Sequence, residues 1–366
     1  MSNQHTTKLS DYTSYPFLIP KIYLDFDIRS DLVEVESLMI IKPKLKESAS
    51  LILKGNQIKL ITISINGNEL NSKEYCLSSN ELVIYNTPIS EFDLKIIAQI
   101  DPFRNTSLEG LYLSAGMLTT QCEAEGFRSI CFHPDRPDIL SKYTVRIEAD
   151  KDLYPVLLSN GNKKNSSNLR NNKHRHEILW DDPFPKPSYL FALVAGKLKI
   201  VSDKYFTNTG RLIDVKIYVE SGDEKYTQHA IKSLKKAMKW DEDVYGLEYD
   251  LDEYKIVAVR HFNMGAMENK GLNIFNSKLV LADSETATDD ELERIESVIA
   301  HEYFHNWTGN RITCRDWFQL SLKEGLTVFR DQSFTADLHS YGIKRIEDVS
   351  FLRNFQFAED KGPTSH

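Results

Sequence analysis

The stretch VIAHEYFHNW, residues 298–307, places two histidines four positions apart, with a glutamate directly after the first. On an α-helix, positions i and i+4 lie on one face, so His301 and His305 can direct two imidazoles at one metal ion while Glu302 lies beside it. This is the zincin arrangement H-E-x-x-H. The alternative is coincidence, because a chain with ten histidines contains such a pattern by chance in roughly one case in fifty.

The residues around the motif predict the helix that carries it. The segment 288–310 opens with Thr288 and Glu291 at the spacing of a capping box and runs to Gly309, a residue type that commonly follows a helix end. We therefore expect one helix over this whole segment. Residues 225–246 predict a second helix, because apolar residues recur at three- and four-residue steps and a glycine follows the last of them.

A third metal ligand is expected at Glu324. Eighteen residues separate it from His305, which is enough for a helix end, a return loop and a second helix. Catalytic zinc usually has three protein ligands and a fourth position open for water. In the alternative, Ser321 caps that second helix and Glu324 is its capping-box partner. Asp331, two turns further on, either orients a histidine or faces solvent.

The first half of the chain has the pattern of short strands. Stretches that are rich in β-formers or alternate in polarity are residues 23–28, 81–85 and 142–148. Asn66-Gly67 is a strong signal for a two-residue hairpin turn. Many short strands at this spacing predict a β-sandwich. The polar segment 159–176 is expected to be a loose loop at a solvated hairpin tip, because it has almost no apolar side chains to bury. An interaction patch formed by its basic residues is the less favoured alternative.

Composition excludes several classes of function. The net charge of −8 opposes binding to nucleic acid or to acidic membranes, so we expect neither as a partner. The four cysteines form no C-x-x-C pair and are expected to be reduced thiols. The first twenty residues lack the basic and apolar regions of a signal peptide, and no apolar run is long enough to cross a bilayer. We therefore expect a cytoplasmic protein.

Two further motifs complete a family resemblance. MGAMENKGLNIF at 264–275 precedes the histidine motif, and TQCEAEGFR at 120–128 lies in the strand-rich half. Together with H-E-Y-F-H and HNWTGNRITCRDWFQLSLKEG, they resemble the gluzincin aminopeptidases of the aminopeptidase N family, and the last stretch is similar to the bacterial members. The resemblance covers nearly the whole chain. It implies a saddle-like, antiparallel N-terminal β-sandwich over residues 1–197 and a thermolysin-like α+β catalytic domain, incomplete at its C-terminal end, over residues 198–366.

The residues of the expected metal site can then be given roles in catalysis. One Zn²⁺ per chain is expected between His301, His305 and Glu324, where it lowers the pKa of its bound water toward about 7. Glu302 is expected to act as the general base that takes the proton of this water and passes it to the leaving amine, a contribution of typically about 10²–10⁴ in rate.

The other half of the site must recognise a free α-ammonium group. The resemblance implies that Glu268 binds this group and that Gln121 and Glu123 join it from the first domain. Carboxylates in a confined pocket suit this task, because an ammonium group forms charge-assisted hydrogen bonds that a blocked terminus cannot form. The expected substrates are therefore peptides with a free N-terminus.

The residues before Glu268 are expected to lie along the substrate. Gly265 and Ala266 present bare backbone, which suits an extended peptide added as a strand, although a simple turn is the alternative. Met264 and Met267 are either core residues or part of a pocket for the substrate's side chain.

The chain departs from the family pattern at its end. The family's oxyanion-stabilising tyrosine falls beyond the last residue, His366, and losing one such donor typically costs about 10²–10³ in kcat. We therefore expect weak aminopeptidase activity and association with the missing C-terminal portion. Two alternatives stay open, a catalytically silent zinc-binding fragment and an epoxide hydrolase of the same superfamily.

Overall fold

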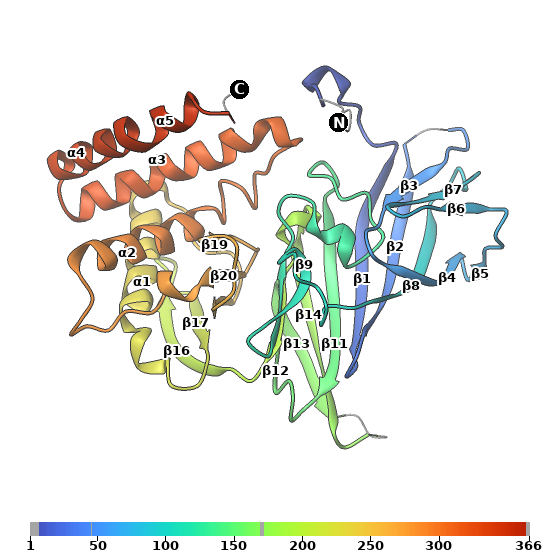
Figure 1. Ribbon diagram of the computed structural model, residues 1–366, viewed down its shortest axis with the longest axis horizontal. Helices are drawn as coiled ribbons and strands as arrows, with labels where there is room; N and C mark the ends of the chain where they lie inside the picture. Colours follow the sequence, from blue (N-terminus) through green and yellow to red (C-terminus); the bar gives the residue numbers. More distant parts are fainter. Residues whose placement is uncertain (1–6, 45, 169–171, 364–366) are drawn as a thin grey trace.

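The computed structural model describes residues 7–44, 46–168 and 172–363. A strand-rich N-terminal part and a mixed C-terminal part lie side by side (Figure 1). The order of a β-sandwich followed by α+β structure is the one expected from the sequence.

The N-terminal β-sandwich contains three sheets. The largest has eight strands, in the order β13 (Asn162–Asn168), β14 (Arg175–Lys186), β11 (Ser141–Asp150), β1 (Phe17–Ile28), β2 (Val33–Pro43), β8 (Phe92–Ile100), β4 (Lys59–Ile65) and β5 (Asn68–Glu69). A second sheet contains β12 (Val156–Ser159), β15 (Leu193–Gly196), β10 (Met117–Gln121) and β9 (Gly110–Ser114). The third contains β3 (Leu51–Lys54), β7 (Glu81–Ile84) and β6 (Tyr75–Leu77).

Alternating polarity in these strands becomes alternating burial. In β2 and β11, buried residues alternate with partly exposed ones, as expected for strands with one face on a core. Asn66 and Gly67 form the turn between β4 and β5, with φ angles of 49° and 80°, which confirms the predicted hairpin. β1 pairs with β11 in parallel, whereas its pairing with β2 is antiparallel. The expected antiparallel sandwich therefore includes one parallel pair.

The segment 159–176 differs from the expected loose loop. Residues 162–168 form β13, whose backbone pairs with β14 from Asn162 opposite Asp181 to Asn168 opposite His176. Polar composition does not prevent this, because strand pairing uses main-chain hydrogen bonds and a solvent-facing strand needs few apolar side chains. Residues 169–171, also part of the expected loop, lie outside the described residues.

The C-terminal part is a five-stranded sheet with helices. The strand order is β16 (Lys199–Phe206), β17 (Leu212–Val219), β18 (Glu253–Val259), β20 (Leu272–Asn276) and β19 (Ala266–Met267). The helices are α1 (Gln228–Tyr245), α2 (Asp289–Phe304), α3 (Leu320–Leu338), α4 (Tyr341–Phe351) and α5 (Phe357–Asp360), with a π-helical turn at Leu352–Gln356 before α5. In Figure 1, α3 and the α4–α5 segment lie side by side on the outside of α2.

The capping signals locate most helix ends. α1 ends at Gly246 in the left-handed conformation, and the Thr288–Glu291 capping box starts α2, both as expected. However, α2 ends at Phe304 rather than near Gly309. The glycine belongs to the following irregular turn, where its φ of 144° is a conformation that favours glycine.

The N-terminus of α3 rules out the alternative in which Ser321 caps this helix. Its N-cap is Gln319, which makes no side-chain capping bond, and Ser321 lies inside the first turn. Ser321 therefore does not cap α3, and Glu324 is not its capping-box partner.

The two parts share buried surface. The larger apolar core contains residues of the sandwich together with Val257, Met267 and Ile274 from the five-stranded sheet. A second core lies between that sheet and α1 and α2, and includes Ile299, Tyr303 and Phe304. Because Met267 and Ile274 belong to β19 and β20, the shared core fixes this hairpin against the sandwich.

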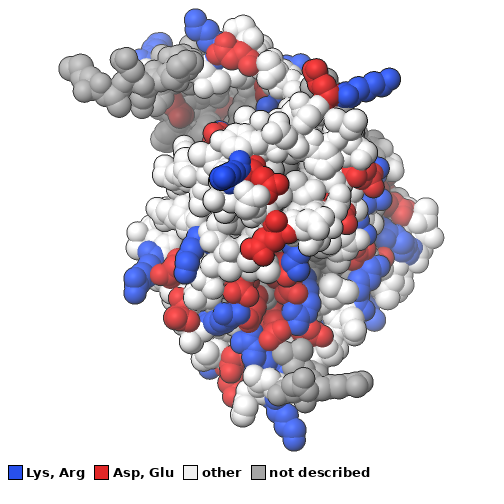
Figure 2. All heavy atoms as spheres, turned by 90° about the vertical axis from the view of Figure 1, so that its right-hand side faces the viewer, with Lys and Arg blue, Asp and Glu red and all other residues white. Residues whose placement is uncertain are grey.

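The surface carries charges of both signs. On the face of the sandwich in Figure 2, acidic and basic side chains are intermixed. On the eight-stranded sheet, for example, Arg146 pairs with Asp25, Glu148 and Glu177. All four cysteines are free thiols. In the described part of the chain, no helix combines the length and apolar character required to span a membrane.

Candidate active site

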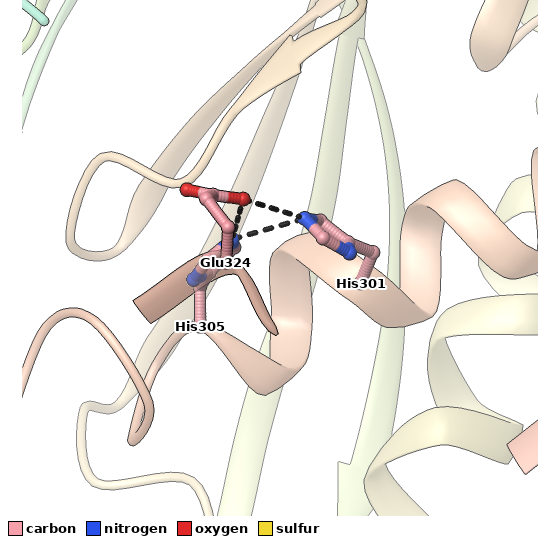
Figure 3. A group of neighbouring side chains, drawn as sticks. All are labelled: His301, His305 and Glu324. Atoms are coloured by element: carbon pink, nitrogen blue, oxygen red, sulfur yellow. Dashed lines mark hydrogen bonds and ion pairs between the residues drawn. The ribbon is translucent and has the colours of Figure 1, made fainter. Parts of the chain in front are cut away.

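The three expected metal ligands converge at the end of α2 (Figure 3). His301 lies in the last turn of α2, His305 is the residue that caps it, and Glu324 extends from α3. The Nε2 atoms of the two histidines are 3.0 Å apart. Glu324 Oε2 lies 3.5 Å from His301 Nε2 and 3.4 Å from His305 Nε2. Tetrahedral zinc with ligands at about 2.0–2.2 Å keeps neighbouring ligand atoms about 3.3–3.5 Å apart. The two edges that end on Glu324 match this spacing and the edge between the imidazoles is shorter, so the three atoms can hold a zinc ion after a small movement of the rings.

The second nitrogen of each imidazole is already engaged. Asp331 Oδ2 lies 2.6 Å from His301 Nδ1, and Thr308 O lies 2.8 Å from His305 Nδ1. Thr327 Oγ1 also approaches His305 Nδ1, at 3.1 Å. Such contacts fix the ring tautomer and leave Nε2 free to bind metal. Asp331 is buried against His301 and does not face solvent.

Glu302 lies beside the ligands in a low-dielectric position. Its residue exposure is only 7%, and burial raises the pKa of its carboxyl group to about 8. Among the described residues, its buried Oε2 has no hydrogen-bond partner. A carboxylate that is buried, unpaired at one oxygen and next to a metal site has the environment of a general base.

These groups open into one cavity of about 360 Å³. Its lining contains His301, Glu302, His305, Glu324, Glu123, Ala124, Met264, Ala266, Glu268 and Leu320. The carboxylates of Glu123 and Glu268 thus face the same space as the metal ligands, although they come from the loop after β10 and from the turn between β19 and β20.

Lys323 pairs with the acidic side chains of this cavity, and the sequence did not reveal it. Its ammonium group donates to Glu123 Oε1 at 2.7 Å, contacts Glu268 Oε1, and lies 3.1 Å from Glu324 Oε1. Burial and the nearby Glu268 carboxylate raise the pKa of Glu123 to about 7. Burial opposes the charge of Lys323, but the carboxylates of Glu268 and Glu123 outweigh it and raise the pKa of this lysine.

The remaining site candidates lie around this cavity. Gln121 is 1% exposed, and its Nε2 donates to Glu123 O at 3.2 Å and approaches Met267 Sδ at 3.7 Å. Met267 is fully buried in the shared core, whereas Met264 is 41% exposed and lines the cavity. Gly265 accepts a backbone hydrogen bond from Asn276 at 2.9 Å. The two methionines therefore differ, one in the core and one at the cavity.

Comparison with family models matches both parts of the chain. The model described as the Peptidase M1 N-terminal domain matches residues 19–190, and the model of the Peptidase family M1 domain matches residues 229–366.

Individual relatives extend this match over nearly the whole sequence. Aminopeptidase N of Caulobacter vibrioides is 53% identical over 358 residues, which cover 98% of this chain and 41% of the relative. Aminopeptidase N of Escherichia coli is 53% identical over 357 residues, covering 97% and 40%. The crystal structure of Legionella pneumophila aminopeptidase A in complex with aspartic acid superposes with a TM-score of 0.89 at 38% identity, covering 93% of this chain and 40% of that one. The chain thus spans about 41% of the length of the first of these relatives.

Proposed function

The chain belongs to peptidase family M1, and on that premise we propose that its cavity removes N-terminal residues from peptides with the aid of one zinc ion. The observation that carries this proposal is the convergence of His301, His305 and Glu324 in one cavity with Glu123 and Glu268. The first three residues supply a metal site, and the last two supply acidic groups for an amine.

A bound zinc ion would polarise the scissile carbonyl group and lower the pKa of a coordinated water. In the proposed reaction, Glu302 takes a proton from the attacking water and delivers it to the nitrogen of the leaving amine. Its burial keeps the carboxylate basic enough for the first transfer. Asp331 holds the His301 ring in place through Nδ1 during both transfers.

Glu123 and Glu268 are proposed to select the free N-terminus. In the structure both pair with the single ammonium group of Lys323, and two carboxylates with one such partner retain negative charge for a substrate ammonium group. The side-chain amide of Gln121 holds the Glu123 segment in place by donating to the backbone carbonyl of Glu123. Gly265, Ala266 and Met264 are proposed to lie along the substrate, with Met264 next to its first side chain. Met267, which is buried, would act only through the hairpin that it packs.

The test combines metal content with turnover. We expect about one zinc ion per chain and release of p-nitroaniline from alanyl-p-nitroanilide. N-acetylation of that substrate should abolish the reaction, because the acetylated amine has no positive charge. Glu302→Gln should retain zinc while turnover falls by about 10²–10⁴. Protein that holds no zinc, or equal turnover with Gln at position 302, would overturn the proposal.

We also propose that helices α3 and α4 pack against further polypeptide. Each exposes large apolar side chains, including Leu322, Phe329 and Ile346 at 61%, 62% and 71%. Because α3 carries Glu324, incomplete packing of this helix would loosen one metal ligand. We therefore expect weak turnover from this chain alone and faster turnover after mixing with the complementary part of a long relative. Unchanged turnover after mixing would contradict this part.

The remaining assignments are also proposals. We place the boundary between domain 1–197 and domain 198–366 after β15, since β15 and the next strand, β16, belong to different sheets. Four free cysteines favour a reducing compartment such as the cytoplasm.

A further inference from the structure

The turn that carries Glu268 is held by contacts from two other parts of the chain. Residues 268–271 join β19 to β20. The side-chain amide of Asn310 donates to Glu268 O at 2.9 Å, and that of Asn160 donates to Lys270 O at 2.9 Å. All four residues are at most 4% exposed. The turn is thus fixed both to the segment after α2 and to the N-terminal sandwich.

The side chain of Lys270 adds a third connection. Its ammonium group contacts Asp250 and donates to Asn306 Oδ1 at 2.7 Å. Asn306 Nδ2 lies 3.3 Å from the same Asp250 oxygen, and Arg311 approaches the other oxygen at 2.5 Å. The Lys270 side chain is 1% exposed. Since Asn306 directly follows His305, this network joins the turn of Glu268 to the segment that carries a metal ligand.

We propose that Lys270 is a positioning residue that sets the spacing between Glu268 and His305, and thereby the affinity of the cavity for a free α-ammonium group. The inference rests on the proposed function of this cavity. Glu268 Oε1 lies 3.9 Å from His305 Nδ1, so small shifts of the turn change the distance between the amine site and the metal site. A misplacement of about 1 Å in such an arrangement can cost about 10²-fold in rate.

Lys270 acts only through the residues that it holds. It is absent from the described residues that line the cavity, and its ammonium group points to Asp250 and Asn306. A ligand held by both an amine contact and a metal contact depends on their spacing, whereas a ligand held by the metal alone does not. Loss of Lys270 should therefore weaken the first kind of ligand selectively.

A purely structural lysine would behave differently, and the chain offers a matched example. Lys186 is also 1% exposed and pairs with a buried carboxylate, that of Asp182, at 3.1 Å. Its ammonium group lies over the ring of Tyr143, so these contacts belong to the sandwich. Replacing Lys186 by methionine should lower stability in a similar way without changing the spacing of the cavity.

The experiment uses two ligands that differ only in the amine. Binding of alanine hydroxamate and of propionohydroxamate is measured by calorimetry on the zinc-loaded chain and on its Lys270→Met, Lys270→Gln and Lys186→Met variants. For Lys270→Met we expect about tenfold weaker binding of alanine hydroxamate, propionohydroxamate within twofold, and unchanged zinc content. Lys270→Gln, which keeps a donor for Asn306, should show the same selectivity at smaller amplitude, and it decides the question if the methionine variant does not fold.

The outcomes distinguish the positioning role of Lys270 from the amine-binding function of the cavity. Equal weakening of both hydroxamates, or no weakening of either, in the Lys270 variants would overturn the positioning role, as would the same selectivity in Lys186→Met. If the unmodified chain binds no zinc, or binds the two hydroxamates equally, the amine-binding function itself is wrong, and the positioning role falls with it.

Discussion

The two sides of the cavity are built in different ways. On the metal side, His301, Glu302 and His305 come from five consecutive residues, and only Glu324 comes from another helix. On the amine side, Lys323 reaches Glu123 across 200 positions of sequence and Glu268 across 55. The metal side thus depends mainly on helix geometry, whereas the amine side depends on how the sandwich meets the C-terminal part. The two sides should therefore respond differently to substitution.

The largest effect is expected on the amine side, from Lys323→Met. This change leaves the carboxylates of Glu123 and Glu268 facing each other without the cation between them. Removing one partner of a buried ion pair typically costs about 3–5 kcal/mol, so we expect a loss of this size in the free energy of unfolding, measured with denaturant at pH 7.5. Adding Glu123→Gln should recover part of the loss. A loss below about 1 kcal/mol would mean that the amine side does not depend on this lysine.

An intermediate effect is expected on the metal side, from Asp331→Asn. The amide cannot supply the negative charge that holds the His301 ring, and loss of such a partner typically weakens metal binding by about 10–100-fold. Competition with a zinc chelator measures this affinity. Thr327→Val is the matched control, because His305 Nδ1 keeps its contact with Thr308 O and should lose little. Equal zinc affinities in the Asp331 variant and the unmodified chain would contradict the role of Asp331.

A buried histidine that packs against the segment after Glu123 predicts a pH dependence of stability. His133 is fully buried beside Phe127, and burial lowers the pKa of its imidazole from 6.5 to about 3. Because the folded pKa lies below the unfolded value, the neutral ring contributes full stability above pH 6.5. That contribution is lost as pH falls from 6.5 toward 3, by up to about 1.4 kcal/mol per unit.

The variant His133→Asn tests this dependence. Its free energy of unfolding should fall less steeply between pH 6.5 and 4.5 than that of the unmodified chain, although it starts from a lower value at pH 8. Asn retains an acceptor for the backbone N–H of Asp135, which His133 Nδ1 accepts at 2.9 Å. Parallel curves for the two proteins would show that another group controls acid unfolding.

The same contrast explains how much of the site could be predicted from the sequence. The period of an α-helix brings His301 and His305 together in any context, so their spacing indicated the metal side, which the expected third ligand Glu324 and the family resemblance then supported. A lysine beside a glutamate on a helix usually faces solvent, and nothing local distinguishes Lys323 from such a residue. Its role depends on Glu123, and therefore on the meeting of two domains, which no short stretch encodes.

The fold shows the same difference between features that local sequence determines and features that depend on contacts between distant segments. The capping box of Thr288 and Glu291, the helix end at Gly246 and the Asn66-Gly67 turn depend on local sequence, and their positions agree with the structure. β13 was missed because its stability comes from pairing with β14, and its own polar side chains carry no strand pattern. The end of α2 was placed too late because Gly309 serves an irregular turn that is held by contacts with other segments, including that of Tyr189 Oη with Gly309 O at 3.2 Å.

The smallest effect on folding is expected at α4, which packs against α3, the helix that carries Glu324. Ile346 on α4 is 71% exposed, so Ile346→Glu should change the free energy of unfolding by less than about 0.5 kcal/mol. The same change should reduce self-association, because it places a charge among the exposed apolar side chains of α3 and α4. Ile89→Glu, at a residue that is 62% exposed in the sandwich, is the control and should leave association unchanged. Sedimentation velocity over a range of concentrations distinguishes the variants. If both change association equally, α4 has no special role, and the metal side is no more dependent on outside packing than the sandwich.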